Sequence, residues 1–424
     1  MGKIHNEILS EIEGVGQGIG RKRLFVSACE PSSNLHLRYL APYLSSEWEL
    51  CGVFENLPQF PHATPSYTLK DFAVMGFFDV LKKLRFYKRA VREMSALAQE
   101  CDCALLMDSS SFNIPIAKAL KEAHSSVRVV YYILPQVWAW KPWRAKILES
   151  VCDELCAILP FELALYPRAQ AQGRARYVGH PLLDEIPQLK QKPARKGAIV
   201  FMPGSRRGEI KRIFPTFAKV ARRLREGATS KNMKCENLGC VNQMDENLGR
   251  EKSEIELEQH ILVLPEHFRS LSIEELRELY GEEIEHFTLS FDANSALFSA
   301  RFAFVCSGTA TLQAVLIGTP LVLGYKTRAL EVAIARAFVR LRHIGLANIF
   351  YTALHSGSPR GGEGGWQIHP ELIQNEMTES KLLAAYEASM KEVDSFFSKA
   401  MELRAYLKHG AAQQVAKIVQ VKVK

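Results

Sequence analysis

Short apolar runs alternate with stretches of helical periodicity along most of the chain, and this alternation constrains the fold more than any other feature. An order of strand, helix, strand favours a parallel sheet with helices on both faces. The apolar runs are residues 24–28, 49–54, 104–107, 127–133, 155–159 and 176–178 and, after a polar linker at 187–196, residues 198–202, 260–264, 302–306 and 320–324. The sequence therefore predicts an α/β protein with two doubly wound, Rossmann-like domains, whose ligands bind in a cleft at the carboxyl ends of the strands.

The length of 424 residues fits two domains, because a single core rarely organises more than about 250–300 residues. We expect an N-terminal extension at 1–20, a first domain at 21–190, a second at 191–380, and C-terminal helices at 381–424 that pack back across the first domain. Residues 228–258 are polar and contain ENLG twice, which predicts a disordered insertion in the second domain.

Composition excludes several classes of protein. The nine cysteines are scattered without zinc-site spacing, which indicates reduced thiols in a cytosolic protein. We expect neither a signal peptide nor a membrane-spanning segment, because no apolar run is long enough. The net charge of +8 favours anionic partners, but the absence of an arginine-rich tract argues against nucleic acid.

The stretch FMPGSRRGEIKR at 201–212 has the residues of an anion site. Pro203 and Gly204 end the strand, and Ser205 suits a helix N-cap. Arg206 then lies where free backbone N–H groups and the helix dipole favour negative charge. The same residues also fit a capped surface helix with solvated arginines.

A second junction, CSGTATLQAVLIGTP at 306–320, ends a buried strand in Ser-Gly-Thr. Small residues let the backbone approach a ligand, the hydroxyls of Thr309 and Thr311 can donate to phosphate, and Gln313 is a candidate ribose contact. A capped core helix also explains this stretch, but two such junctions in one domain indicate a nucleotide diphosphate site. No D-x-D pair or metal-spaced cluster occurs, so we expect neither a metal nor another cofactor.

In the first half, MDSSSFN places Asp108 directly after the apolar run at 104–107. A carboxylate at this end of a strand can take a proton from an alcohol nucleophile, although an Asp that only caps the following turn is the alternative. His36 and His180 also follow strands and are further candidates for hydrogen bonding in the cleft.

The segment FAVMGFFDVLKKLRFYKRAVR at 72–92 places apolar side chains before a basic cluster. This order suits a helix at an anionic bilayer surface, and equally a core-facing amphipathic helix with a solvated basic side. The candidate membrane contacts are Met75, Phe77, Phe78 and Leu81.

Taken together, these motifs resemble the lipid-A-disaccharide synthases, glycosyltransferases of the GT-B fold. The resemblance runs from about residue 24 into the C-terminal helices, apart from 228–258. It rests, in the family's order, on SACEPSSNLH, FAVMGFFDVL, MDSSSFN, ILPQVWAWKPWR, ILPFE, YVGHPLLDE, MPGSRRGEIKR, SGTATLQAVLIGTP, GLANIF and HPELIQ. It implies that UDP-2,3-diacylglucosamine donates its sugar to the 6-hydroxyl of 2,3-diacylglucosamine 1-phosphate, with inversion to a β-1,6 disaccharide and release of UDP.

The resemblance also implies a role for each motif. Asp108 would be the catalytic base, and Arg206 would contact the diphosphate during the reaction. The implied UDP-binding residues are Gly204, Ser205, Arg206, Ser307, Gly308, Thr309, Ala310, Thr311, Gln313 and Asn348. The implied acceptor or cleft residues, in the acceptor-binding and membrane-facing first domain, are Ser27, Glu30, Ser32, Asn34, His36, Asn113 and His180.

Two departures from the family pattern bear on these roles. The usual S-A-G-E-A-S-G-D-x-H-G is SACEPSSNLHL here. Asn34 replaces the Asp and cannot act as a base, and because glycines are replaced, the family pattern does not predict the conformation of this acceptor loop. Gln313 stands where the family usually has Glu, which predicts weaker nucleotide binding, because charge-assisted hydrogen bonds are the stronger ones.

The expected partners are the lipid-linked UDP-sugar donor, the monosaccharide lipid acceptor and the cytoplasmic surface of the inner membrane in a Gram-negative bacterium. A homodimer is also possible, because terminal helices that reach across domains could be exchanged between two chains. The alternatives are another GT-B enzyme on UDP-N-acetylhexosamine, either a 2-epimerase or the peptidoglycan GlcNAc transferase, and a non-catalytic nucleotide-sugar binder.

Overall fold

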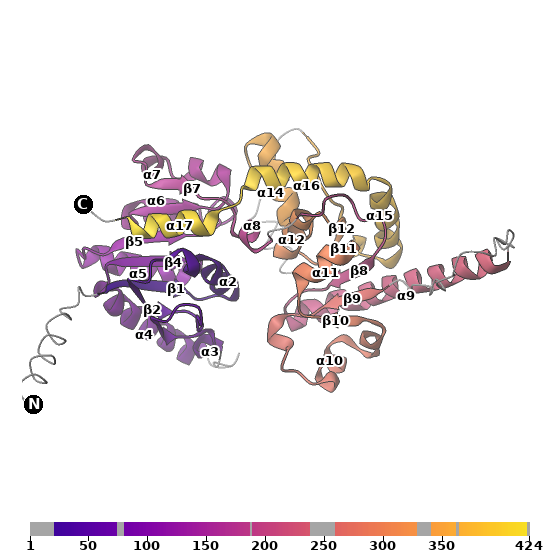
Figure 1. Ribbon diagram of the computed structural model, residues 1–424, viewed down its shortest axis with the longest axis horizontal. Coiled ribbons are helices and arrows are strands. Elements are labelled where there is room, and N and C mark those ends of the chain that lie inside the picture. Colours follow the sequence, from indigo (N-terminus) through magenta and orange to yellow (C-terminus); the bar gives the residue numbers. More distant parts are fainter. Residues whose placement is uncertain are drawn as a thin grey trace, which may run out of the picture. The chain divides into compact units, whose positions relative to one another are not determined.

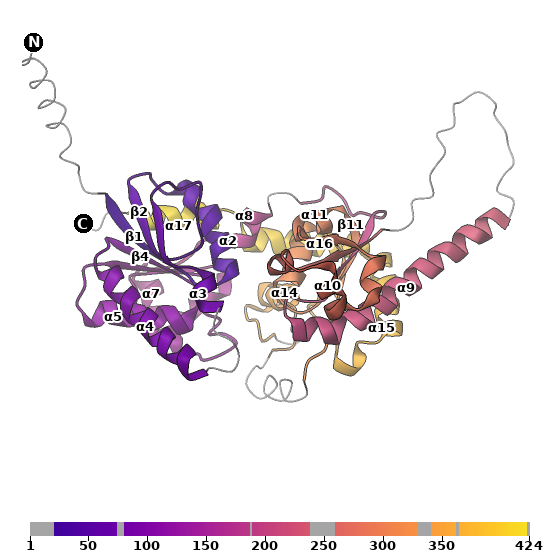
Figure 2. The ribbon, with the colours of Figure 1, turned by 90° about the horizontal axis from the view of Figure 1, so that it is seen from below.

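The computed structural model describes residues 21–73, 80–186, 189–237, 259–328, 341–361 and 364–421 (Figures 1 and 2). Within these residues the chain divides into two compact units. Unit 1 consists of residues 21–185 and 409–421, and unit 2 of residues 186–408. Each unit is built around one parallel sheet and is described by itself.

The sheet of unit 1 has the strand order β3-β2-β1-β4-β5-β6-β7, and every pairing is parallel. Its strands are β1 (Lys22–Ala28), β2 (Trp48–Val53), β3 (Ala63–Tyr67), β4 (Cys103–Met107), β5 (Arg128–Tyr132), β6 (Glu154–Ala157) and β7 (Ala175–Tyr177). Its helices are α2 (Pro31–Leu40), α3 (Leu69–Ala73), α4 (Val80–Gln99), α5 (Ser110–Glu122), α6 (Arg144–Val151), α7 (Pro167–Ala171), α8 (Pro181–Glu185) and α17 (Ala411–Gln420), with 3₁₀ turns η1 (Ala41–Tyr43) and η2 (Pro160–Leu165).

Helix α17 comes from the end of the chain and covers one face of this sheet (Figure 1). Its residues Val415 and Val419 are buried in the same apolar cluster as Leu24 of β1 and Leu37 of α2. The carboxylate of Asp184 accepts hydrogen bonds from the backbone N–H groups of Gly410 and Ala412, each at 2.7 Å, and so caps the helix start.

The sheet of unit 2 has the order β10-β9-β8-β11-β12-β13, again with parallel pairings throughout. Its strands are β8 (Ala198–Met202), β9 (His260–Val263), β10 (Thr288–Ser290), β11 (Ala300–Val305), β12 (Leu321–Tyr325) and β13 (Glu371–Ile373). Its helices are α9 (Arg207–Asn237), α10 (Ile273–Tyr280), α11 (Ala293–Ser299), α12 (Thr309–Ile317), α14 (Leu346–Ser356), α15 (Glu379–Lys391) and α16 (Val393–Leu407), with 3₁₀ turns η3 (Glu266–Phe268), η4 (Glu282–His286) and η5 (Gln374–Glu376).

Both sheets reverse their strand order once, between β1 and β4 in unit 1 and between β8 and β11 in unit 2. In open parallel sheets such a reversal leaves a crevice at the carboxyl ends of the two strands, where ligands bind. The α/β class and the two doubly wound domains are thus confirmed. The strands that the apolar runs did not predict, β3, β10 and β13, are short and only partly buried, which explains the missing apolar signal.

The structure places the division between the units at residues 185 and 186, earlier than the expected boundary at 190. Lys190 belongs to unit 2 because its buried ammonium donates to the carbonyl of Ala300 at 2.5 Å and to the hydroxyl of Thr319 at 2.9 Å. Burial lowers the pKa of this ammonium to about 8.

The C-terminal region differs from the expectation for 381–424, since only its last helix joins unit 1. Helix α16 stays in unit 2, where the guanidinium of Arg404 donates to the carbonyls of Leu316 at 2.8 Å and Ile186 at 2.9 Å. The expectation of disorder was wrong for residues 228–237, which continue helix α9 (Figure 2). Residues 238–258, like the N-terminal extension at 1–20, lie outside the described residues.

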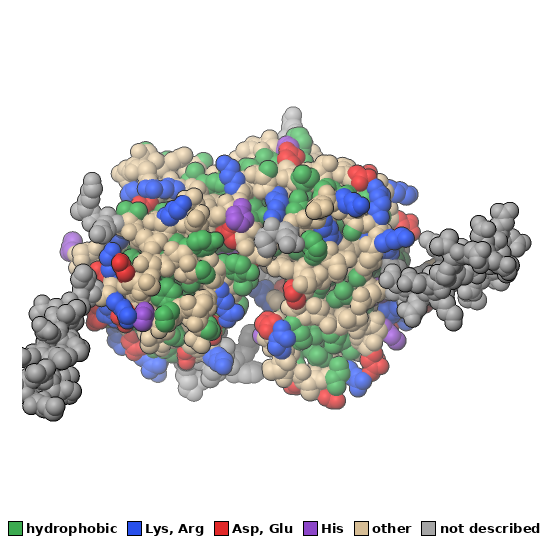
Figure 3. Space-filling view, viewed as in Figure 1, with side chains coloured by type: hydrophobic (Ala, Val, Ile, Leu, Met, Phe, Trp, Pro, Cys, Tyr) green, Lys and Arg blue, Asp and Glu red, His purple; other side chains and the backbone are tan. Residues whose placement is uncertain are grey.

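No helix among the described residues is long and apolar enough to span a membrane. On the face drawn in Figure 3, Lys and Arg side chains are scattered over both units rather than gathered in one stripe.

Candidate active site

In unit 2, the two predicted anion junctions meet because they follow adjacent parallel strands. Met202 at the end of β8 is paired with Val305 at the end of β11, and the N–H of Cys306 donates to the Met202 carbonyl at 2.8 Å. The two loops, together with residues 263–266, 291 and 293, line an open cavity of about 420 Å³. The predicted UDP-binding residues that line it are Gly204, Ser205, Arg206, Ser307, Gly308, Thr309, Ala310 and Gln313.

The first junction turns at Gly204, whose φ is +123°. A β-carbon there would lie 3.0 Å from a carboxylate oxygen of Glu209 and 3.4 Å from the sulfur of Cys306, so this position needs glycine for both conformation and space. Helix α9 begins at Arg207, and the carbonyl of Arg206 accepts from the N–H of Ile210. Arg206 is therefore the cap position, one residue later than the predicted cap Ser205.

The second junction turns at Gly308, with φ of +129°, and helix α12 starts directly afterwards. Thr309 is exposed and lines the cavity, but Thr311 is fully buried and its hydroxyl donates to the Gly308 carbonyl at 3.0 Å. Thr311 thus fixes the turn and has no free hydroxyl for a ligand. The amide of Gln313 reaches the cavity and donates to the side-chain oxygen of Asn294 at 2.7 Å.

The cavity carries opposite charges at its rim. The guanidinium of Arg206 is 82% exposed and lies 3.3 Å from the carboxylate of Glu209, which is only 14% exposed. A second carboxylate, that of Glu266, lines the same cavity and is paired with Arg269 at 2.6 Å. Arg206 can therefore turn toward an anion by exchanging Glu209 for it, since exposed pairs are weak. Glu209 and Glu266 were not among the predicted site residues.

Asn348 does not line this cavity. It is fully buried, its Nδ2 donates to the His369 carbonyl at 2.9 Å and to Glu371 at 2.8 Å, and its oxygen accepts from the N–H of Ile368 at 2.8 Å. All the hydrogen-bonding capacity of this amide is used internally. The structure thus gives Asn348 a positioning role instead of the predicted contact with UDP.

The carboxylate of Glu371 completes this network, a residue of the HPELIQ motif to which the sequence analysis gave no role. It accepts from the N–H groups of Ile344 at 3.0 Å and Gly345 at 3.1 Å, and so caps helix α14. The Ile344 carbonyl in turn accepts from the hydroxyl of Ser307 at 3.2 Å. Glu371 therefore supports the cavity loop from behind.

In unit 1, the loops after β1 and β4 meet in the same way. Ala28 at the end of β1 pairs with Met107 at the end of β4, and Met107 pairs with Tyr132 of β5. Across this junction the hydroxyl of Ser109 donates to the carboxylate of Glu30 at 2.9 Å. The MDSSSFN motif after β4 and the SACEPSSNLH motif after β1 thus belong to one site.

Asp108 has a left-handed backbone, with φ of +51°, and Ser109 follows with φ of +32°. Such angles are strained for residues other than glycine, and surrounding contacts must hold them. The N–H of Asp108 donates to the carbonyl of Tyr132 at 3.0 Å. The carbonyl of Asp108 accepts from the hydroxyl of Tyr131 at 2.5 Å and from the side-chain amide of Asn113 at 3.1 Å. These main-chain bonds leave the carboxylate available at the carboxyl end of β4.

Burial, and to a smaller extent the nearby charge of Glu30, raise the pKa of Asp108 to about 6, against the lowering effects of the Ser109 N–H and His36. A carboxylate with a pKa near neutrality is poised for proton transfer at physiological pH.

The remaining acceptor candidates divide into structural and accessible groups. Ser27 and Asn113 are fully buried and bonded to each other at 2.6 Å, so they shape the turn beneath Asp108. Asn34 is also consumed internally, since its amide donates to the Ala28 carbonyl at 2.6 Å and its oxygen accepts from Glu55 N–H at 2.7 Å. Ser32 and Glu30 are exposed and accessible to a ligand.

The two histidines take different positions. The Nδ1 of His36 is hydrogen-bonded to the carboxylate of Glu185, and both side chains are largely buried. His180 is buried and accepts from the N–H of Leu182 at 3.3 Å, and burial together with the charge of His36 lowers its pKa to about 3. A neutral, buried His180 is a structural residue, whereas His36 lies close enough to influence Asp108 electrostatically.

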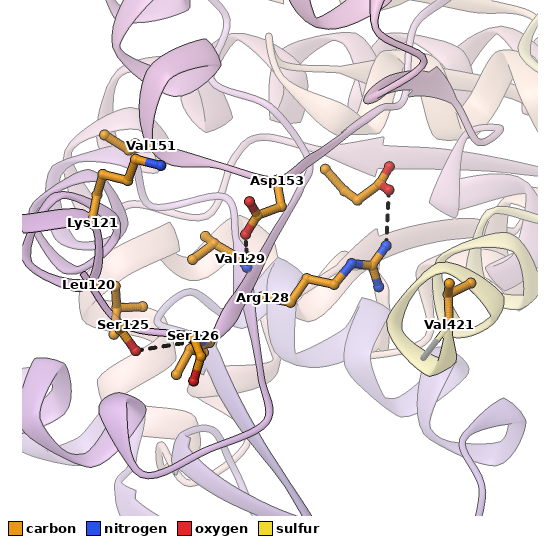
Figure 4. A pocket seen from close by; sticks show the side chains of 11 residues that line it. Leu120, Lys121, Ser125, Ser126, Arg128, Val129, Val151, Asp153 and Val421 are labelled. Carbon is orange, nitrogen blue, oxygen red and sulfur yellow. Dashed lines mark hydrogen bonds and ion pairs between the residues drawn. The ribbon is translucent and has the colours of Figure 1, made fainter. Parts of the chain in front are cut away.

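A further cavity of about 350 Å³ lies at the other, amino-terminal edge of the unit 1 sheet (Figure 4). Two of its charged side chains already have partners: the guanidinium of Arg128 donates to the carboxylate of Glu154 at 2.9 Å, and the carboxylate of Asp153 accepts from the N–H of Val129 at 2.7 Å. It has no part in the site at Asp108.

Among the residues that the structure describes, no cluster of three or more His, Cys, Asp or Glu side chains could hold a metal ion. The predicted membrane contacts Met75, Phe77 and Phe78 lie outside the described residues, and Leu81 belongs to helix α4.

Comparison with known proteins gives a consistent match. The model of the lipid-A-disaccharide synthetase family matches residues 24–238 and 250–421. The lipid-A-disaccharide synthase of Helicobacter acinonychis is 46% identical over 93% of this chain and 96% of its own length. That of Campylobacter jejuni is 37% identical over 94% of this chain and 99% of its own. These matches do not favour the alternative GT-B enzymes or a non-catalytic binder.

Solved structures of low sequence identity share the fold. The UDP-GlcNAc 2-epimerase of Neisseria meningitidis, bound to UDP-GlcNAc, superimposes with a TM-score of 0.52 at 9% identity, over 93% of this chain and 98% of that one. A UDP co-structure of MnaA from S. aureus gives a TM-score of 0.52 at 11% identity, over 93% of this chain and 94% of that one. The predicted GT-B type of fold is thereby confirmed.

Proposed function

Because the chain belongs to the lipid-A-disaccharide synthase family and is a glycosyltransferase that forms the lipid A disaccharide, we propose that Asp108 is the base of its transfer step. The acceptor is a 2,3-diacylglucosamine 1-phosphate and the donor a UDP-2,3-diacylglucosamine. The Asp108 carboxylate takes the proton of the acceptor 6-hydroxyl as that oxygen attacks the anomeric carbon. The bond from this carbon to the diphosphate breaks, UDP leaves, and the single displacement inverts the configuration.

One observation carries this assignment: a carboxylate with a pKa of about 6 stands at the strand-order reversal of unit 1, with its backbone fixed on both sides. Glu30 is the other carboxylate of this junction, but its bond to Ser109 and its exposure leave it as a modulator of the Asp108 pKa.

The nucleotide site in this proposal is the cavity at the strand-order reversal of unit 2. The start of helix α12 and the hydroxyls of Ser307 and Thr309 would bind the diphosphate, and Gln313 would contact the ribose. Arg206 would leave Glu209 and compensate the charge that grows on departing UDP. With these groups the reaction needs no metal, which is part of the proposal.

We also propose that the protein works at the cytoplasmic surface of the inner membrane, because both substrates carry acyl chains. The apolar segment at 75–81 is one contact, and replacing Phe77 and Phe78 with Ser should lower vesicle binding. A homodimer is a further element of the proposal, and sedimentation of the purified protein checks it.

The test is turnover of UDP-2,3-diacylglucosamine and 2,3-diacylglucosamine 1-phosphate by the purified protein with EDTA present, beside its Asp108→Ala variant. We expect disaccharide and UDP from the parent and at least a hundredfold less from the variant. UDP binding measured by calorimetry serves as the control and should be equal in both. An Asp108→Ala enzyme that turns over like the parent overturns the assignment of the base, and activity abolished by EDTA overturns metal independence.

A further inference from the structure

The loop between β5 and α6 exposes two indole side chains. Trp140 is 41% exposed and Trp143 is 59% exposed, whereas their neighbour Trp138 is 4% exposed and packs edge-on against Phe161 with ring centroids 5.7 Å apart. Tryptophan is normally well buried, because a large apolar surface in water is unfavourable. Of the three indoles in this VWAWKPW stretch, only that of Trp138 is buried, so the exposure of the other two needs another explanation.

The charged residues within this segment of the chain all have one sign. From Pro135 to Leu148 the sequence contains no Asp or Glu, but it contains Lys141, Arg144 and Lys146. The ammonium of Lys141 lies 5.3 Å from the ring centroid of Trp140. The next carboxylate along the chain, that of Glu149, accepts from the backbone N–H groups of Arg168 at 2.8 Å and Ala169 at 2.9 Å.

Hydrogen bonds within unit 1 hold the loop in this conformation. The N–H of Trp140 donates to the Gln136 carbonyl at 3.0 Å, the N–H of Arg144 donates to the Lys141 carbonyl at 3.1 Å, and Lys141 has a left-handed φ of +52°. The guanidinium of Arg144 donates to the hydroxyl of Ser110 at 2.6 Å. Since Ser110 begins helix α5 two residues after Asp108, the loop stands at the same sheet edge as the proposed base.

We infer that residues 139–146, the tryptophan loop, insert Trp140 and Trp143 into the headgroup region of an anionic bilayer. Indole rings favour this region because it accommodates an apolar face and a polar N–H together. Lysine and arginine beside them attract acidic lipid headgroups, and the absence of carboxylates in the loop removes repulsion. This contact is additional to the segment at 75–81 and would hold the lipid surface beside Asp108.

The inference rests on the proposed function only in that lipid substrates come from a bilayer. Its test therefore measures membrane binding, without substrates. The full chain is floated with vesicles of phosphatidylethanolamine and phosphatidylglycerol, and with vesicles of phosphatidylcholine alone. The variants are Trp140→Ser/Trp143→Ser and, as a matched control, Trp366→Ser, which removes an indole of similar exposure, 38%, from unit 2.

We expect the double variant to bind anionic vesicles roughly tenfold more weakly, because two partly buried indoles are lost from the interface. Trp366→Ser should bind like the parent, and Lys141→Glu/Lys146→Glu should lose binding at low salt but less so at high salt. Tryptophan emission of the parent should shift to the blue on anionic vesicles, and this shift should vanish in Trp140→Phe/Trp143→Phe. The emission measurement keeps the test valid if the serine variant folds poorly.

Unchanged partitioning of the double variant, or an equal loss in Trp366→Ser, overturns the inference. In the first case, vesicle binding could stay the same while turnover of detergent-dispersed substrate falls. That result would assign the indoles to the acyl chains of a bound substrate. If the inference holds, turnover in detergent stays within about twofold of the parent while turnover on vesicles falls with binding. Failure of the proposed function would appear separately, as absent turnover with normal vesicle binding.

Discussion

The two units place their functional loops at equivalent positions, the strand-order reversals, but the backbone conformation of these loops is achieved in different ways. In unit 2 the left-handed positions are glycines, Gly204 and Gly308, so that the backbone approaches a ligand without strain. In unit 1 the left-handed positions are Asp108 and Ser109, where strain is accepted and the carboxylate is held out by main-chain hydrogen bonds. One topology thus serves binding by backbone in one unit and proton transfer by a side chain in the other.

The comparison predicts that Asp108→Gly separates stability from activity. Turnover should fall by about 10²–10⁴-fold, because the base is lost. The free energy of unfolding at pH 8 should not decrease, because glycine relaxes the φ of +51°. The pKa of Asp108 is raised in the folded state, so the ionised carboxylate destabilises the fold above pH 6. Removing this carboxylate should therefore increase the free energy of unfolding above pH 6. Chemical denaturation and product assays check this, and a marked loss of stability would refute the account of strain.

In unit 2 the corresponding change is Arg206→Ala, which should weaken UDP binding by roughly ten- to a hundredfold, since a charge-assisted contact to the diphosphate is lost. The matched control is Arg207→Ala, because that guanidinium lies over the ring of Phe268 and does not line the cavity. Calorimetry with UDP measures both variants. Equal losses in the two would mean that general positive charge, not the cavity contact, binds the nucleotide.

The pH dependence of turnover should report unit 1 alone. With Asp108 as the base, kcat/KM should fall below about pH 6, where the carboxylate becomes protonated. Glu30→Gln removes a charge that raises this pKa, so the acid limb should move to lower pH and activity at pH 5.5 should increase a few-fold relative to the plateau. Arg206→Ala should leave the limb in place. A limb unmoved by Glu30→Gln would show that burial alone sets the pKa.

A change of similarly small size is predicted for Gln313, in unit 2. Gln313→Glu should tighten UDP binding about fivefold, because a carboxylate accepts ribose hydroxyls about 1 kcal/mol more strongly than an amide. The Asn294 amide, which now accepts from Gln313 at 2.7 Å, can reverse and donate to the new carboxylate. Gln313→Ala is the control and should bind UDP more weakly than the parent. An unchanged affinity in Gln313→Glu would remove Gln313 from the ribose contact.

The sequence alone determined the features that depend on neighbouring residues. The alternating apolar runs predicted the two parallel sheets, because buried strands and amphipathic helices each have a recognisable local pattern. The junctions around Arg206, Thr309 and Asp108 were visible for the same reason, since strand ends, glycines and helix starts are local features. The confirmed family and GT-B type of fold followed from the order of these motifs.

Only the tertiary structure decided which polar side chains remain free for a ligand. Asn348, Thr311 and Asn34 looked like ligand contacts in their motifs, yet each uses its hydrogen-bonding groups inside the fold, with partners such as Glu371 that sequence spacing does not reveal. The same holds for the start of α17, which is capped by the carboxylate of Asp184 although more than two hundred residues separate the two. Such pairings depend on which distant strands and helices become neighbours, so only the packing of the whole unit sets them.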